Sequence, residues 1–205
     1  MNIVRFWILL GLLWVFPWTV GAGEPRGVLG FRSFGADHGL TNTAVKALAQ
    51  DGEGFLWVGT EDGLFRMEGH HFRRFGEEDG LFSNRISDGG LAAAYPKGLW
   101  VDTEKGLLLW DGKRFLKPSA LGMAGLDGRP GTPLPQGGVI LSDQPSQTRY
   151  LARGREGFEP IRGLPWGTGM TAAALSADGR TLAVGLGTEL WVRRDGQWNG
   201  GRGPL

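Results

Sequence analysis

An internal repeat of about 42 residues limits what this chain can fold into. The stretch GLTNTAVKALAQDGEGFLWVGTEDGLFRMEGHHFRRF at residues 39–75 returns as GLFSNRISDGGLAAAYPKGLWVDTEKGLLLWDGKRF at residues 80–115. Both stretches contain Leu-Trp-Val, and Trp57 and Trp100 are 43 positions apart. A repeat of this length indicates one structural unit used several times along the chain.

A third, more divergent copy, AAALSADGRTLAVGLGTELWVRRDGQW, covers residues 172–198. It places Gly185 126 positions after Gly59, which is three periods of 42. The segment between the second and third copies is assigned to one further unit by spacing alone. The four predicted units cover residues 39–79, 80–121, 122–163 and 164–205.

A period of about 40 to 45 residues with four short strands per unit is typical of β-propeller blades. In the first unit we expect strands over residues 44–50, 55–59, 63–67 and 72–75. Trp57 and Trp100 are expected to fill the seams, the layers of side chains between neighbouring blades. We therefore predict an all-β chain: about four four-stranded blades of a β-propeller over residues 28–205, forming part of a larger propeller.

The segment ahead of the first unit repeats a later one. GFRSFGADHGL at residues 30–40 is similar to HFRRFGEEDGL at residues 71–81. Residues 31–34 are accordingly expected to form the outer strand of a preceding blade. This expectation also favours a piece of a longer propeller, or a truncated copy of one.

The first 22 residues, MNIVRFWILLGLLWVFPWTVGA, have the layout of a secretory signal peptide. Arg5 supplies positive charge, residues 6–16 are apolar, and small residues precede a cleavage point after Ala22. The alternative is an uncleaved membrane anchor, but the apolar run is shorter than the roughly 20 residues of a spanning helix. Either interpretation predicts that the rest of the chain lies in the periplasm.

The first unit closely resembles the two-component-regulator propeller repeat. Nine of its residues occupy the places of that pattern: Asn42, Val45, Asp51, Gly54, Trp57, Gly59, Thr60, Gly63 and Leu64. The second unit matches at Asn84, Trp100, Thr103, Gly106 and Leu107, with Asp102 in place of the second glycine and Lys97 in place of the acidic turn residue. The last unit could equally belong to a generic WD-type blade.

The resemblance implies a sensor. Propellers of this family form the periplasmic half of membrane receptors, followed by a small β-sandwich, a membrane helix and a cytoplasmic histidine kinase or diguanylate cyclase. Those later parts have no counterpart in these 205 residues. A membrane-linked signalling module is therefore expected only as a partner of this chain.

Composition and motifs argue against several other functions. Lys plus Arg number 22 and Asp plus Glu 21, so no basic face indicates nucleic acid, and the absence of cysteine excludes thiol chemistry. His70 and His71 fall on a predicted turn rather than at metal-ligand spacing. The acidic ends of residues 51–62 enclose apolar residues where a calcium loop needs oxygen ligands. The glycines of GTGMTA at residues 167–172 lack the β-α-β context of a dinucleotide loop. We expect a non-enzymatic protein with no metal and no cofactor.

Propellers usually bind ligands at one face, through the loops between strands two and three and the loops between blades. In this chain those loops include residues 60–62, 103–105 and 76–85, and His38. We predict a polar binding rim for a small molecule or glycan, made by Glu61, Asp62, Glu104 and Lys105. Each of these residues also suits an ordinary solvated turn.

Two aromatic residues outside the repeat register, Tyr95 and Trp166, suit stacking against a ring-shaped ligand. Three further hypotheses remain open from the sequence: a secreted scaffold that binds a protein or glycan, a propeller lyase or glycosidase, and a fragment without function.

Overall fold

The computed structural model describes residues 30–94, 96–134, 136–143, 148–153, 158–164 and 170–201. The chain divides into two compact units, Met1–Ser33 and Phe34–Leu205. The described residues of the first unit, 30–33, form neither helix nor strand. The predicted signal peptide lies outside the described residues. The described ranges contain no helix with the length and apolar character needed to cross a membrane.

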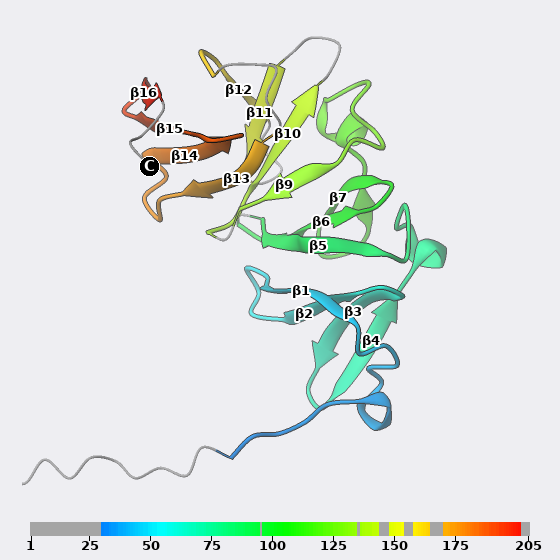
Figure 1. Ribbon diagram of the computed structural model, residues 1–205. Helices are drawn as coiled ribbons and strands as arrows, with labels where there is room; N and C mark the ends of the chain where they lie inside the picture. Colours follow the sequence, from blue (N-terminus) through cyan, green and yellow to red (C-terminus); the bar gives the residue numbers. More distant parts are fainter. Residues whose placement is uncertain are drawn as a thin grey trace, which may run out of the picture. The chain divides into compact units, whose positions relative to one another are not determined.

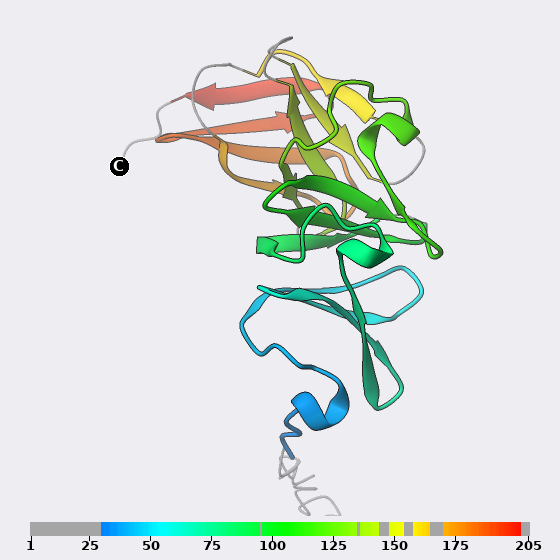
Figure 2. The ribbon, with the colours of Figure 1, turned by 90° about the vertical axis from the view of Figure 1, so that its right-hand side faces the viewer.

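The second unit consists of four-stranded antiparallel sheets in chain order (Figures 1 and 2). The first two sheets are formed by β1 (Val45–Gln50), β2 (Leu56–Thr60), β3 (Gly63–Glu68) and β4 (His71–Phe75), and by β5 (Ile86–Ala93), β6 (Leu99–Thr103), β7 (Gly106–Trp110) and β8 (Phe115–Leu116). The other two are formed by β9 (Gly131–Pro133), β10 (Val139–Asp143), β11 (Thr148–Ala152) and β12 (Phe158–Ile161), and by β13 (Met170–Leu175), β14 (Thr181–Leu186), β15 (Glu189–Arg194) and β16 (Gln197–Gly201). Neighbours in each sheet are neighbours in the chain, as in a propeller blade.

These sheets confirm the predicted all-β, blade-like fold. Each sheet lies within one of the four ranges expected from the repeat, and the strands of the first sheet begin and end within one residue of their predicted bounds. His71 is the first residue of β4 rather than part of the preceding turn, which ends at His70. The period of about 42 residues therefore corresponds to one four-stranded antiparallel sheet per repeat unit.

The predicted outer strand over residues 31–34 is wrong, because these residues form no strand. A strand needs a hydrogen-bonded neighbour, and none of the described strands pairs with this segment. What the repeated sequence does share is the turn that follows. The 3₁₀ helices η2 (Ala36–His38) and η3 (Glu77–Asp79) each end at a glycine with positive φ, Gly39 at 83° and Gly80 at 108°.

The core of this unit lies in the seams. One buried cluster joins the first sheet to the second, another the second to the third, and another the third to the fourth. Trp57 lies in the first of these clusters and Trp100 in the next, both with no exposed surface. The prediction that these two rings fill seams is confirmed, and their burial explains why the repeat keeps a tryptophan at this position.

Candidate functional site

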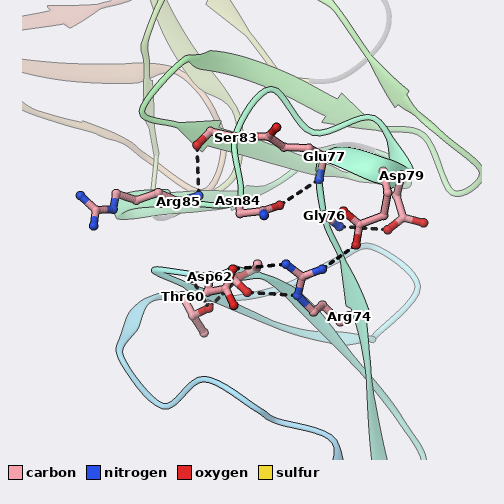
Figure 3. Close-up of polar contacts among 11 residues, drawn as sticks. Thr60, Asp62, Arg74, Gly76, Glu77, Asp79, Ser83, Asn84 and Arg85 are labelled. Atoms are coloured by element: carbon pink, nitrogen blue, oxygen red, sulfur yellow. Dashed lines mark hydrogen bonds and ion pairs between the residues drawn. The ribbon is translucent and has the colours of Figure 1, made fainter.

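The β2–β3 and β6–β7 turns lie beside the segment that joins the first two sheets. Glu61 and Asp62 form the first turn, Glu104 and Lys105 form the second, and residues 76–85 run from β4 to β5. The four predicted rim residues therefore belong to two turns, and Figure 3 shows Asp62 of the first turn beside residues of the connection.

Backbone hydrogen bonds hold both turns to this connection. The amide of Gly63 donates to the carbonyl of Asn84 at 2.8 Å, and the amide of Glu104 donates to the carbonyl of Arg85 at 3.2 Å. The connection is thus held by the turn of the sheet before it and by the turn of the sheet after it. Side chains on the three segments have fixed neighbours as a result.

The repeated threonines shape the turns. The hydroxyl of Thr60 donates to the carbonyl of Gly63 at 2.9 Å, and the hydroxyl of Thr103 donates to the carbonyl of Gly106 at 2.9 Å. Both threonines are buried, so their role is to close a tight turn rather than to contact a ligand. The acidic residues at the turn tips are exposed.

Glu61 and Asp62 each have a cationic neighbour. The Nζ of Lys46 lies 3.1 Å from Oε1 of Glu61. Arg74 on β4 donates from Nε to the carbonyl of Asp62 at 3.1 Å, and Nη2 of Arg74 lies 3.3 Å from Oδ1 of Asp62. The same guanidinium meets Oε1 of Glu78 at 2.5 Å, so Arg74 links the turn to the η3 helix (Figure 3).

Glu104 and Lys105 also find partners on the connection. Oε1 of Glu104 accepts a hydrogen bond from the hydroxyl of Ser83 at 3.0 Å. The Nζ of Lys105 lies 3.4 Å from Oε1 of Glu77. The structure therefore places all four predicted residues on one surface, each with a local polar partner. A ligand that uses them would have to share or displace those partners.

The pKa values of two side chains on this surface, Lys46 and Glu78, are shifted toward the charged form. A hydrogen bond to Glu61, followed by one to Asp88, raises the pKa of the Lys46 ammonium. A hydrogen bond from its own backbone amide, followed by the charge of Arg74, lowers the pKa of the Glu78 carboxyl. These two side chains thus carry opposite charges at neutral pH.

Ser83, not Asn84, takes the place of the repeat asparagine in the second unit. The side chain of Asn42 accepts a hydrogen bond from the amide of Ala44 at 2.9 Å, and the hydroxyl of Ser83 accepts one from the amide of Arg85 at 3.2 Å. The side chain of Asn84 instead accepts a hydrogen bond from the first residue of η3 at 2.9 Å. The resemblance placed Asn84 one residue out of register.

Asp88 is a rim residue that the sequence reasoning missed. Its carboxylate lies 3.4 Å from Nζ of Lys46, so the ammonium meets two acids from two sheets. Asp88 lies where the register of β5 shifts, between Ile86 and Leu91. The repeat offset is 41 residues before this point and 43 after it, and that change is the signal that could have located a bulge.

A cleft of about 340 Å³ lies at the corresponding end of the third and fourth sheets. It is lined by Arg129, Pro130, Gly131, Thr132, Ser142 and Met170. Its volume lies within the range of roughly 300 to 1,000 Å³ that small-ligand sites occupy. A guanidinium and two hydroxyls on its wall can bind anionic or hydroxyl-rich groups.

Other candidates from the sequence are not brought into this site. Tyr95, Trp166 and residues 167–169 lie outside the described residues. Among the residues that the structure does describe, no group of three or more His, Asp or Glu side chains is arranged to hold a metal ion.

A family comparison agrees with the repeat pattern. Residues 39–62 match the model of the two component regulator propeller. The chain carries a two component regulator propeller repeat. This repeat includes β1, β2 and the turn of Glu61 and Asp62. The comparison with curated proteins finds no match.

Solved structures agree with the fold. The extracellular domain assigned to a hybrid two component system, BT4673, of B. thetaiotaomicron is 22% identical, with a TM-score of 0.54 over 80% of this chain. Virginiamycin B lyase from Staphylococcus aureus is 10% identical, with a TM-score of 0.55 over 78% of this chain. The chain covers 22% of the first structure and 56% of the second. At these identities the likeness establishes the fold.

Proposed function

We propose that this chain is a non-enzymatic, periplasmic ligand-sensing propeller of the two component regulator type. Its ligand is a small molecule or glycan, bound at the end of the sheets that carries the β2–β3 and β6–β7 turns. The information that a ligand is bound would pass to a membrane-linked signalling module.

The observation that carries this proposal is the position of the family repeat in the fold. The matched residues end at Glu61 and Asp62, on the same end of the sheets as the charged network and the 340 Å³ cleft. The extracellular domain of the hybrid two component system, similar in fold, supports a sensing role at the outer face of a membrane.

The chemistry of the network favours a ligand rich in hydroxyl groups. A hydroxyl can donate to the carboxylates of Asp62 and Glu104 while it accepts from Arg74 or Lys105. Because several of these side chains are exposed, a ligand can reach them without unfolding a turn. Mixed charges that pair with one another also disfavour binding of a highly charged polymer such as nucleic acid.

The test is a binding screen of the exported full-length chain against small molecules and oligosaccharides, followed by calorimetry on each ligand found. Asp62→Ala and Glu104→Ala should each weaken the binding of that ligand by roughly tenfold to a hundredfold, because each removes one charge-assisted hydrogen bond. Binding that stays unchanged in both variants contradicts the proposed site.

Glu53→Ala is the matched control. Glu53 also forms an exposed ion pair between the first two sheets, 2.9 Å from Nζ of Lys97, but on the turns at the opposite end of the strands. Its loss should leave affinity within twofold of the parent protein. An equal loss in all three variants would indicate a general effect on folding.

A further inference from the structure

The first seam, between the first and second sheets, joins two unlike faces. The first sheet contributes a face of small residues around one tryptophan, with Ala47 opposite Gly59 and Ala49 opposite Trp57. A Cβ added at Gly59 would lie 2.6 Å from a methyl of Ile86, so the second sheet packs directly onto this glycine. A larger residue here would separate the sheets.

The second sheet contributes a branched face to the same seam. Leu91 lies opposite Val101 in the β5–β6 pair, and Leu99 lies two residues before Val101 on β6. All three side chains are buried against the first sheet. Small residues on one sheet thus accommodate branched residues on the next.

The first sheet carries the same branched face on its other side, where the two leucines are open and the valine, Val58, is buried. Leu48 lies opposite Val58 in the β1–β2 pair, at the positions that Leu91 and Val101 occupy in the second sheet. Leu48 is 63% exposed and Leu56, the counterpart of Leu99, is 37% exposed. We call Leu48, Leu56 and Val58 the leucine face.

The outer edge of the leucine face is already covered as it would be inside a seam. The ring of Phe34 meets the ring of Phe72 edge-on, with centroids 5.7 Å apart. In the first seam Phe75 meets Phe115 in the same way, at 6.0 Å. Phe34 thus takes the place of a Phe75 from a preceding sheet.

The fourth sheet exposes the face that fits. Ala172 lies opposite Gly185, and Ala174 lies opposite Ala183, in the register of the small-residue face of the first sheet. Ala172 and Ala174 are both exposed. Leu190, which continues this face on β15, is 58% exposed. We call Ala172, Ala174, Ala183 and Gly185 the alanine face.

One position makes the two faces specific for each other. Leu64 on β3 lies opposite Phe75 on β4, whereas the equivalent Leu190 lies opposite Gly201 on β16. The alanine face therefore has no ring where the first seam has Phe75. The leucine face supplies that ring from its own side, as Phe34.

We propose that the leucine face of one copy of this chain binds the alanine face of a second copy, extending the packing of the first seam from chain to chain. Each copy has one face of each kind, so the contact is head to tail. Such a contact can continue into longer assemblies or close into a ring of copies. Burial of apolar surface drives it.

The test is sedimentation velocity of the purified full-length chain over a range of concentrations. The parent chain should form dimers and larger species as its concentration rises. Leu48→Lys and Ala174→Lys should each be monomeric, because each introduces a charge into one face. A parent chain that is monomeric at every concentration overturns the proposal.

Mixing the two variants separates a head-to-tail contact from a general loss of folding. Leu48→Lys keeps its alanine face and Ala174→Lys keeps its leucine face, so an equimolar mixture should form dimers and nothing larger. A mixture that stays monomeric overturns the proposal. So does a Leu48→Lys variant that dissociates while Ala174→Lys still assembles, since that pattern indicates a symmetric contact.

Ala120→Lys is the matched control, because Ala120 is exposed on the η4 helix (Pro118–Leu121), outside both faces. It should assemble as the parent chain does, and its dissociation would count against the proposed faces. Where Leu48→Lys does not fold, as judged by circular dichroism, Leu56→Lys replaces it with the same expected result.

Discussion

A single carboxylate distinguishes the first sheet from the second at the residue scale. Asp51 is buried and accepts a hydrogen bond from Nε1 of Trp57 at 2.8 Å and two more from turn amides. The same turn position in the second sheet is Ala94. The Nε1 of Trp100 is buried and has no hydrogen-bond partner among the residues that the structure describes.

Asp51→Ala should leave Trp57 with a buried indole N–H that has no acceptor, as Trp100 already has within the described ranges. The buried Nε1 of Trp57 would lose its acceptor, which costs about 1–3 kcal/mol of the free energy of unfolding. Asp51→Asn keeps one acceptor oxygen and should cost less. Urea denaturation followed by tryptophan fluorescence measures both values, and an Asp51→Ala variant as stable as the parent would contradict this account.

At the scale of elements, Asp102 changes how two sheets meet. It stands on β6 where the first sheet has Gly59, and its Oδ1 accepts a hydrogen bond from the amide of Gly131, the first residue of β9, at 2.7 Å. Burial raises the pKa of Asp102, against the lowering effect of hydrogen bonds from Gly131 and Ser87. The seam between these sheets therefore holds a carboxyl group that binds its proton more tightly than an exposed aspartate does.

This raised pKa makes the second seam sensitive to pH. The folded state holds the proton of Asp102 more tightly than the unfolded state, in which an aspartate has a pKa of about 3.9. The contribution of Asp102 to stability is therefore fully present below that pH and is lost as pH rises through the folded pKa. Asp102→Asn removes this loss while keeping an acceptor for Gly131.

We expect the stability of Asp102→Asn, relative to the parent chain, to increase from pH 3.5 to pH 7. The rise should be about 1.4 kcal/mol for each unit that separates the folded pKa from the unfolded one. Urea midpoints at several pH values measure it. A difference between the two proteins that does not change with pH would show that Asp102 titrates normally.

At the scale of the whole unit, burial is unequal among the sheets. Every residue of β6 and β7 is buried, since the second sheet has a seam on each side. In the fourth sheet, β15 has no buried residue. In a stack of sheets joined by seams, local stability depends on the number of neighbouring sheets.

Amide hydrogen exchange should therefore be slowest in β6 and β7 and faster in β13 and β15. The measurement needs a protein concentration at which the chain is monomeric, since self-association would cover β13. The Leu48→Lys variant, which we expect to be monomeric, allows the same exchange measurement at higher concentration. Equal protection across all sheets would mean that the unit opens only as a whole.

Much of the fold can be read from the repeat because its causes are local. Four strands per period, glycine at turns, and a tryptophan at Trp57 and Trp100 depend on residues close in sequence, and the structure confirms them. The strand expected at residues 31–34 did not form, because a strand exists only when another strand pairs with it. The ring of Phe34 nevertheless packs against Phe72 without a strand to carry it.

For the candidate site, the sequence predicts the positions of the residues but not their partners. The sequence places Glu61, Asp62, Glu104 and Lys105 on turns at one end of the sheets, because strand order determines which turns share an end. Their partners follow from contacts between different strands: Arg74 on β4 meets Asp62 in the β2–β3 turn, and a bulge in β5 brings Asp88 to Lys46 of the first sheet. Such distances depend on register and on the packing of one sheet against the next, which arise only when the chain has folded.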